Sequence, residues 1–328
     1  MNKPLGAIHS GKLTKQNQPL SSNTVSKKQH NPWENISIYK LYTIDTDISV
    51  EWIIASIHDR IFLCNTEGEV RIYSYSNRFR RQPILTEQFR LTTVRLISSF
   101  TVTQDYLVAF ETDTQMLTLH NHHGALMLRI RFPYDPIMII QGDYSRKNCI
   151  WSCSRSKRQC HQFPLDHTMK EINPIEILDF KRPVSNILID PVGISIDDQD
   201  RIGIHDINTS TSDRLLIFDS HHHNMIVPLN FIKYADRQLS SRIERVLLVP
   251  QQPNLIVLVY SPQSTSANLH EIIIIDIAAH PAQILHRITE QYGIQNLDLT
   301  LHGELIYAVT PPSNKRIVPK LHIYRLFN

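Results

Sequence analysis

Groups of short apolar strands recur along the chain at a nearly constant spacing, and this period constrains the fold more than any other feature. One aliphatic–aromatic pair marks the same strand in three of the groups: Ile72-Tyr73, Ile217-Phe218 and Ile323-Tyr324. The pairs are 145 and 106 residues apart. These distances correspond to three units of about 48 residues and two of about 53, a period typical of repeats built from one small sheet each.

Each group has the pattern of a β-meander. Runs of β-branched, aliphatic and aromatic residues such as Ile61–Cys64 and Val70–Tyr75 are separated by residues that favour tight turns, among them Asn65–Glu69. Almost no stretch has the period of a helix. The six groups span Glu51–Phe89, Val94–Ile130, Ile137–Leu178, Val184–Ile232, Ile243–Ile288 and Ile294–Leu326.

The last group has three strand runs where the others have four, while Asn35–Ile44 forms an extra strand ahead of the first group. Pairing this strand into the last group closes a ring and leaves no sheet open at the seam. We therefore predict an all-β fold for residues 34–328, a six-bladed β-propeller closed by its N-terminal strand. A β-sandwich is the competing architecture.

The N-terminal 33 residues differ from the rest in charge and hydropathy. They contain five basic residues and no Asp or Glu: Lys3, Lys12, Lys15, Lys27 and Lys28. The chain as a whole carries +3, so residues 34–328 carry −2. A polar segment with few large apolar side chains cannot offset its chain entropy by burial, and we expect a disordered Lys-rich tail. An organelle-import segment is the alternative, although the tail lacks arginine.

Composition narrows the setting in which the chain works. The most apolar stretches, such as Ile272–Ile275, are far shorter than the roughly 20 residues of a membrane span. The chain starts without the apolar region of a secretory signal, and its four cysteines are too few for a disulfide scaffold. We expect a cytoplasmic monomer that does not associate with membranes.

The fourth group carries the most specific local pattern: Asp190–Asp197, Asp200–Asp206 and Arg214–Asp219. These strands resemble the NHL repeat, in which a Pro-x-Gly-Ile-x-Val-Asp strand precedes Gly-Arg-Ile-Tyr-Val-x-Asp and Arg-Ile-x-Val-Phe strands. The resemblance implies a six-bladed propeller that binds protein or RNA, often as the substrate-recognition part of tripartite-motif ubiquitin ligases. The cysteines lack the paired spacing of RING and B-box zinc modules, so ligase catalysis is not predicted.

One cluster has the composition of a metal site: Cys149, Cys153, Cys160 and His161. A hairpin turn at residues 154–157 pairs Cys153 with Arg158 and Trp151 with Cys160. The three cysteines then share one face of the sheet and His161 points to the other. This geometry favours small apolar side chains packed around Trp151 over a zinc site, which needs four converging ligands. We predict no metal and no cofactor.

Carboxylates near the predicted inner strands give an enzymatic alternative. They are Glu51, Asp190, Glu244 and Asp298. On the axis of a propeller, such groups can hold a divalent cation that polarises an ester or lactone. The chain shows no Ser-His-Asp or paired-carboxylate pattern. A metal-dependent hydrolase is therefore kept as the second alternative function, and no catalytic residue is predicted.

Basic and aromatic residues in predicted loops supply the binding candidates. They are Arg78, Phe79, Arg80, Arg81, Arg155 and Arg158. Loops on a rigid ring present composite surfaces, so the leading hypothesis is a non-catalytic scaffold for protein partners whose identity the sequence leaves open. RNA binding through a local basic rim is the first alternative, because arginine neutralises phosphate and Phe79 can stack on bases.

Overall fold

The computed structural model describes the chain from residue 38 onward, with gaps. The described residues are 38–57, 59–76, 81–92, 95–132, 136–141, 148–154, 159–179, 191–208, 212–218, 224–229, 241–262, 270–279, 282–310 and 318–326. Residues 36–328 form one compact unit, and it alone is considered below. Short β-branched runs between turn residues form strands here because alternate side chains can be buried on the two faces of a sheet.

The strands of the described residues form six four-stranded antiparallel sheets. Sheet 1 consists of β2 (Trp52–Ile57), β3 (Arg60–Cys64), β4 (Glu69–Ser74) and β5 (Ile84–Arg90). Sheet 2 consists of β6 (Ser99–Val102), β7 (Leu107–Glu111), β8 (Met116–His120) and β9 (Leu126–Arg131). Sheet 3 consists of β10 (Pro136–Gln141), β11 (Cys149–Ser154), β12 (Gln159–Pro164) and β13 (Glu176–Asp179).

The second half of the chain repeats this arrangement. Sheet 4 consists of β14 (Pro191–Ile196), β15 (Ile202–Asn208), β16 (Ser212–Phe218) and β17 (Asn224–Pro228). Sheet 5 consists of β18 (Ser241–Leu248), β19 (Leu255–Pro262), β20 (His270–Asp276) and β21 (Gln283–Glu290). Sheet 6 consists of β22 (Gly293–Leu299), β23 (Glu304–Thr310), β24 (Lys320–Arg325) and β1 (Tyr39–Asp45).

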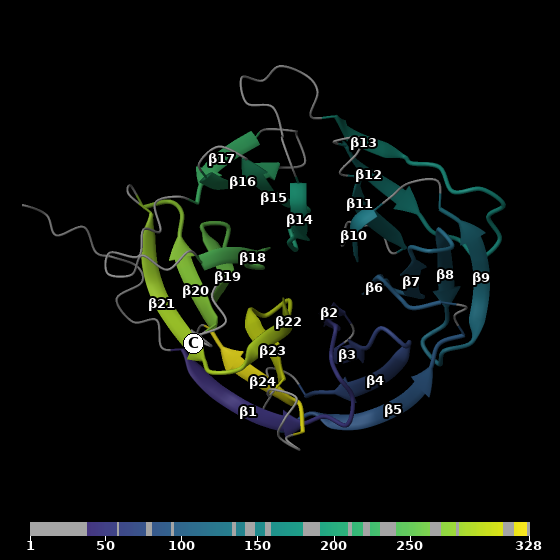
Figure 1. The fold of residues 1–328 in the computed structure, drawn as a ribbon, viewed down its shortest axis with the longest axis horizontal. Helices are drawn as coiled ribbons and strands as arrows, with labels where there is room; N and C mark the ends of the chain where they lie inside the picture. The colour runs from purple at the N-terminus through teal and green to yellow at the C-terminus, as the bar shows by residue number, and fades with distance from the viewer. Residues whose placement is uncertain are drawn as a thin grey trace, which may run out of the picture. The chain divides into compact units, whose positions relative to one another are not determined.

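The first strands of the sheets lie around a common axis, and the fourth strands lie outermost (Figure 1). Along this inner circle β22 contacts β2, β2 contacts β6, β6 contacts β10, β10 contacts β14 and β14 contacts β18. Between β18 and β22, Arg245 Nη1 donates a hydrogen bond of 2.8 Å to Asn296 Oδ1. The chain thus has the all-β propeller fold.

Sheet 6 is built from both ends of the unit. β1 pairs antiparallel with β24, from Tyr39 opposite Arg325 to Asp45 opposite Lys320. This is the pairing that the extra N-terminal strand leads us to expect. Lys40 adds side-chain contacts, because its ammonium group lies 5.3 Å from the ring centroid of Tyr324 and contacts His322 Nδ1.

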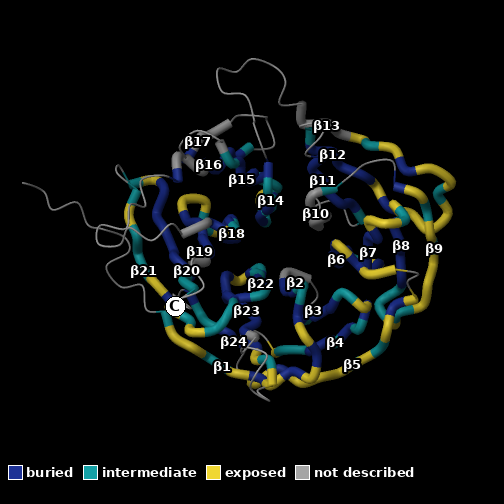
Figure 2. Tube along the Cα trace, viewed as in Figure 1, coloured by how far each residue is buried: buried dark blue, intermediate teal, exposed yellow. Residues whose placement is uncertain are grey.

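The hydrophobic core lies between neighbouring sheets. Between sheets 1 and 2, for example, Phe62 and Ile72 pack with Phe100 and Leu107, and each of these side chains is almost fully buried. Burial is greatest in the inner and middle strands and decreases toward the outermost ones (Figure 2). Removal of this apolar surface from water is the main contribution to stability, and it fixes how each sheet sits against the next.

One turn chemistry recurs in four hairpins. A side-chain oxygen at the first turn position accepts backbone N–H groups from the residues two and four positions later; the first residues are Asn65, Asn121, Asp197 and Thr300. The fourth positions have positive φ: Gly68, Gly124, Asp200 and Gly303. Asn, Asp, Ser and Thr side chains accept turn N–H groups that have no backbone carbonyl partner, which is why these residue types occur between the strands.

Among the described residues there is no helical segment with the length and apolarity that a bilayer crossing requires.

Candidate functional site

Connections between strands reach two opposite rims of the ring. In each antiparallel meander, the first–second and third–fourth connections lie at one end of the strands, and the second–third connection lies at the other end. We call the first end rim 1 and the second end rim 2. A binding surface needs loops from several sheets held in one geometry, and rim 1 of sheets 2 and 3 has this property.

Asn148, just before β11, joins three rim 1 connections. Its Oδ1 accepts hydrogen bonds of 3.1 Å from both the Thr103 hydroxyl and the Asp105 backbone N–H. Its Nδ2 donates to Asp105 Oδ2 at 2.7 Å. Its backbone carbonyl accepts the N–H of Leu165, beyond β12, at 2.8 Å. The half-buried Asn148 therefore contacts the β6–β7 connection through its carboxamide and the β12–β13 connection through its backbone carbonyl.

A second set of contacts extends this arrangement outward. The hydroxyl group of Tyr106 lies 3.0 Å from His167 Nδ1, and the same ring nitrogen lies 3.6 Å from Asp166 Oδ1. Asp166 accepts the backbone N–H of Thr168 at 2.8 Å, and this hydrogen bond lowers the pKa of the exposed Asp166 carboxyl. Nearby, His122 Nε2 lies 3.2 Å from the Thr103 carbonyl oxygen.

Exposed side chains sit on this fixed framework. Asp105, His123, Asp166 and His167 are exposed at the rim 1 connections of sheets 2 and 3. They combine carboxylates with imidazoles, which accept and donate hydrogen bonds. The surface is suited to polar recognition of another macromolecule.

The same rim is connected between sheets 4 and 5. Asp198 Oδ1 accepts the N–H of Gln251 at 2.9 Å, and Arg201 Nη1 donates to the Pro253 carbonyl oxygen at 2.8 Å. Both contacts join the β14–β15 turn to the β18–β19 turn. Fixed neighbouring turns are therefore found at two places on rim 1.

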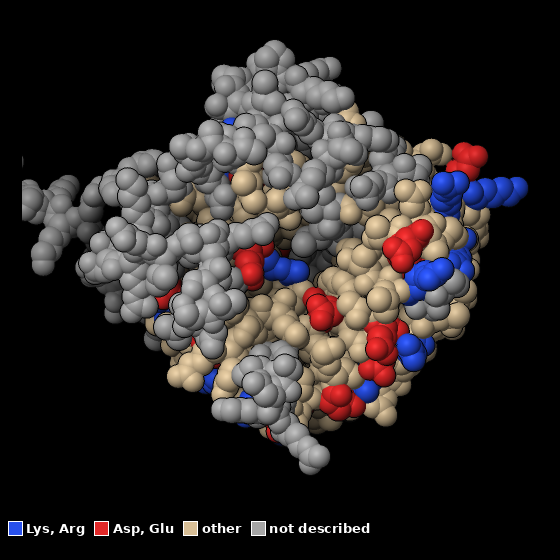
Figure 3. Space-filling model, viewed as in Figure 1, with Lys and Arg blue, Asp and Glu red and all other residues tan. Residues whose placement is uncertain are grey.

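A polar network near the axis joins the inner strands of sheets 5, 6 and 1. Arg245 on β18 donates to Asn296 on β22, and Asn296 Nδ2 donates to the Glu51 carbonyl oxygen just before β2. Asn296 is only 2% exposed, so both ends of its carboxamide are satisfied within the fold. In the view of Figure 3, acidic and basic side chains lie next to one another near the centre of the molecule.

Asp298, two residues farther along β22, has a perturbed acidity. Its Oδ2 accepts the backbone N–H of Ala55 on β2 at 2.7 Å. Burial raises the pKa of Asp298 to about 6, against the lowering effect of the Ala55 and Leu299 N–H groups and of Arg245. Burial also lowers the pKa of Arg245. This network holds three inner strands together and includes a carboxyl group that titrates near neutral pH.

The inner-strand carboxylates of the hydrolase hypothesis are spread along this region. Glu51 precedes β2, Glu244 lies on β18 and Asp298 lies on β22, whereas Asp190 is outside the described residues. Over the described part of the chain, no group of three or more His, Cys, Asp or Glu side chains is positioned to hold a metal ion. Asp298 on β22 accepts the backbone N–H of Ala55 on β2, and this hydrogen bond joins sheet 6 to sheet 1.

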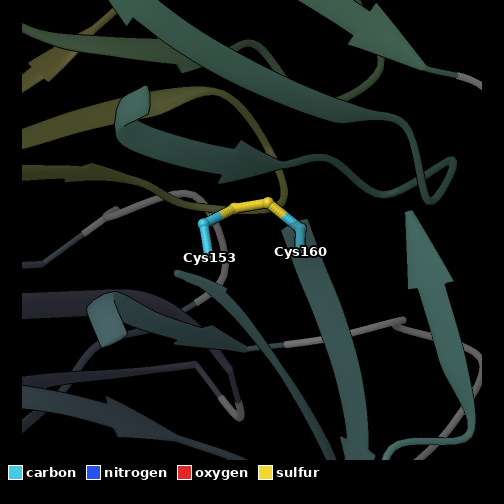
Figure 4. Close-up of a disulfide and its surroundings, with 2 residues drawn as sticks. All are labelled: Cys153 and Cys160. Carbon is cyan, nitrogen blue, oxygen red and sulfur yellow. A yellow bond between two sulfur atoms is a disulfide. The ribbon is translucent and has the colours of Figure 1, made fainter. Parts of the chain in front are cut away.

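The cysteine hairpin corrects the sequence prediction. Cys153 lies opposite Cys160, and Trp151 lies opposite Gln162, so the register is two residues from the predicted one. Cys153 and Cys160 form a disulfide (Figure 4), a bond that the sequence did not lead us to expect. Both pack with Trp151 in the core between sheets 3 and 4, while His161 faces the other side. Disulfide sulfurs are not zinc ligands, and the predicted apolar packing holds for this pair.

The predicted basic contacts fall largely outside the described residues. This applies to Arg78, Phe79, Arg80, Arg155 and Arg158. Arg81 is described and exposed, just before β5.

Along the chain, Arg78–Arg81 stand between β4 and β5, and Arg155 and Arg158 stand between β11 and β12. The sequence analysis also missed Asn148, because its side-chain partners Thr103 and Asp105 stand 45 and 43 residues earlier in the chain and no local pattern links them to it.

No protein-family model matches the sequence, and no curated protein matches it. Among solved structures, a member of the DUF4221 family from Bacteroides vulgatus is similar with a TM-score of 0.57 and 11% identity, covering 88% of this chain and 98% of that one. U3-55K is similar with a TM-score of 0.53 and 8% identity, with the same coverage of each chain. The WD40 domain of Neurospora crassa Pan2 gives a TM-score of 0.48, 11% identity and coverage of 85% and 75%. At such low identities the first two matches support the propeller fold alone.

Proposed function

We propose that this chain is a non-catalytic scaffold that binds a protein partner through rim 1, and that its six sheets act as six blades of one closed ring. The observation that carries the proposal is the Asn148 joint, which holds loops of two sheets in a single geometry. Loops fixed before binding lose less conformational entropy on association, so a composite surface of this kind favours affinity.

The resemblance to NHL repeats supports this proposal. The segments that carry the motif form three consecutive strands, β14, β15 and β16, in the order that the repeat requires. NHL-type propellers use their rims for protein or RNA recognition. The mixed acid and imidazole character of rim 1 favours a protein partner over a polyanion, which needs a cationic surface.

The test is a quantitative affinity experiment with matched variants. The full chain is immobilised and exposed to extract from its source cells, and bound proteins are measured by mass spectrometry. The rim variant carries Asp166→Ala and His167→Ala, which truncate exposed side chains and leave Asn148 and the contact of His123 with Glu87 in place. The control carries Arg287→Ala, an exposed residue on β21.

We expect the wild type and the control to retain the same partner, and the rim variant to lose it by about tenfold or more, as expected for replaced contact residues. Recovery of no protein above background contradicts the proposal. Equal recovery by the rim variant contradicts the assignment to rim 1.

A further inference from the structure

Apolar side chains are exposed on the outermost strands of sheets 1 and 2. On β5, Ile84 is 69% and Leu85 42% exposed; on β9, Leu126 is 43% and Met127 42% exposed. Figure 2 shows exposed residues along the outer course of both strands. Single exposed apolar residues are ordinary, whereas an exposed apolar pair on each of two adjacent outermost strands is a candidate docking surface.

The two strands belong to one surface. The turn that precedes β9 lies against β5, because His123 Nδ1 is 2.9 Å from Glu87 Oε2. At the next residue, Gly124, a Cβ atom would lie only 2.4 Å from the ring of Phe89, so the backbone is packed directly on β5. The name β5–β9 surface is used below for Ile84 and Leu85 at the start of β5, Leu126 and Met127 at the start of β9, Arg81 ahead of β5 and Arg131 at the end of β9.

The charge of this surface is positive. Its carboxylates are matched, since Glu87 contacts Arg60 and His123, and the buried Glu111 contacts Arg129. Arg81 and Arg131 are both exposed, and within the described residues neither has a carboxylate partner. Unmatched guanidinium groups beside aliphatic side chains favour a ligand that carries both carboxylates and apolar groups.

The backbone of the surface favours an extended ligand. β5 and β9 are each the last strand of their sheet, so one edge of each lacks a strand partner within the sheet. An extended peptide can add to such an edge through main-chain hydrogen bonds while its alternate side chains contact the surface.

Two other occupants fit less well. The exposed apolar groups here are aliphatic, whereas single-stranded nucleic acid is held chiefly by stacking on aromatic rings. A second copy of the chain would bring the same arginines against one another in a symmetric contact.

We propose that the β5–β9 surface docks an extended acidic segment of a protein partner, in which Asp or Glu alternates with Leu or Ile. The proposal rests on the protein-binding role and adds a second contact, on the outer wall, to the one on rim 1. The proposed partner segment contacts Arg81 and Arg131 through its carboxylates, and it contacts the two apolar pairs through its aliphatic side chains.

The probe is a fluorescein-labelled synthetic peptide of about twelve residues that alternates Glu with Leu, long enough to cover two strands. Binding to the full chain is measured by fluorescence anisotropy at low and high salt. One variant carries Ile84→Ser and Leu126→Ser, and a second carries Arg81→Gln and Arg131→Gln. The matched control carries Ile175→Ser, which changes an apolar residue that is 50% exposed elsewhere, and Arg287→Gln.

We expect the peptide to bind the wild type and the control alike, and each surface variant about tenfold more weakly. High salt should weaken binding to the wild type more than binding to the Arg81→Gln, Arg131→Gln variant. A Lys–Leu peptide of equal length should bind at least tenfold more weakly than the Glu–Leu peptide.

The proposal is overturned if the Glu–Leu peptide does not bind at about millimolar concentration, or if it binds both surface variants as well as the wild type. It is also overturned if oligouridine binds in its place, or if light scattering shows a wild-type dimer that the Ile84→Ser, Leu126→Ser variant dissolves. These outcomes are separate from the rim 1 test, since the rim variant keeps the β5–β9 apolar side chains and arginines.

Discussion

Two asparagines join neighbouring sheets in this molecule, one at the rim and one at the axis. Asn148 connects loops of sheets 2 and 3 and is half-buried, with neutral hydroxyl and amide groups and one exposed carboxylate as partners. Asn296 connects β18, β22 and β2 and is buried, with the Arg245 guanidinium as one partner. Both carboxamides donate and accept hydrogen bonds, but their surroundings differ.

The difference shows that the same side chain contributes to stability in one place and to loop geometry in the other. When a rim asparagine is removed, water replaces its hydrogen bonds, so little free energy is lost. When a buried asparagine beside a charged group is removed, the groups left behind are desolvated without partners. The contacts near the axis therefore hold neighbouring sheets together, and those at the rim hold the loops in the geometry that we propose for binding.

The largest effect is expected at the axis. Asn296→Ala leaves Arg245 Nη1 and the Glu51 carbonyl without this acceptor and donor, and it should lower the free energy of unfolding by about 3 kcal/mol. Urea denaturation followed by tryptophan fluorescence measures the change. A loss below about 1 kcal/mol, comparable with that of a rim variant, would show that water reaches the axial network and would remove the contrast.

Asp298 should make the same region sensitive to pH. Its folded pKa of about 6 lies above the ordinary value of 3.8, so the folded state holds the proton more tightly than the unfolded chain. Stability is therefore expected to fall as pH rises from about 4 to above 6, by roughly 2 kcal/mol.

Asp298→Asn keeps an acceptor for the Ala55 N–H and cannot ionise, so its stability should vary less over this pH range than that of the wild type. Denaturation midpoints at pH 5 and pH 8 test this expectation. Parallel pH profiles for the two proteins would contradict it.

The rim asparagine should affect loops more than stability. Asn148→Ala is expected to cost about 1 kcal/mol, the usual net value for solvent-accessible hydrogen bonds. Amide hydrogen exchange should become faster around Asp105, because its N–H loses the Asn148 Oδ1 acceptor, and should stay unchanged at Leu165, whose N–H bonds to the Asn148 backbone carbonyl. Partner binding at rim 1 should weaken as well. Unchanged exchange at Asp105 would show that other contacts fix this loop.

The smallest effect is expected at Asp166. The Thr168 N–H lowers the pKa of this fully exposed carboxyl, and solvent screens its other interactions. Asp166→Asn should leave the denaturation midpoint unchanged within error. An NMR titration of the wild-type protein should show a pKa for Asp166 below the ordinary value of 3.8. A clear loss of stability would mean that the rim contributes to holding the ring together.

Strand positions follow from the sequence because they depend on local patterns, and the extra N-terminal strand could be assigned to the last group because that group lacked one strand. The register of one hairpin did not follow. The predicted turn at residues 154–157 lies one residue too early, since Ser154 pairs with Gln159. A shift of two in pairing keeps every side chain on its face and changes its partner, so the faces of Cys153 and His161 were predicted and the disulfide was not.

Site residues were harder to predict than strands, for a physical reason. Asn148 and Asn296 act through partners that the fold brings from distant parts of the chain, and neither stands in a local motif. Arg81, in contrast, could be recognised in the sequence as part of a basic loop. That β5 and β9 lie next to each other could not, because it depends on the packing of the turn at Gly124 against Phe89.

The pairing of β1 with β24 determines how the ring responds to force applied at its two ends. Tyr39, where β1 begins, lies opposite Arg325, where β24 ends, so tension on both strand termini acts on the same end of the ladder. Hydrogen bonds in an antiparallel pair are perpendicular to the strands, and such a pull separates them one after another like a zipper. Tethering at both ends therefore peels β1 away at low tension before any other sheet is disturbed.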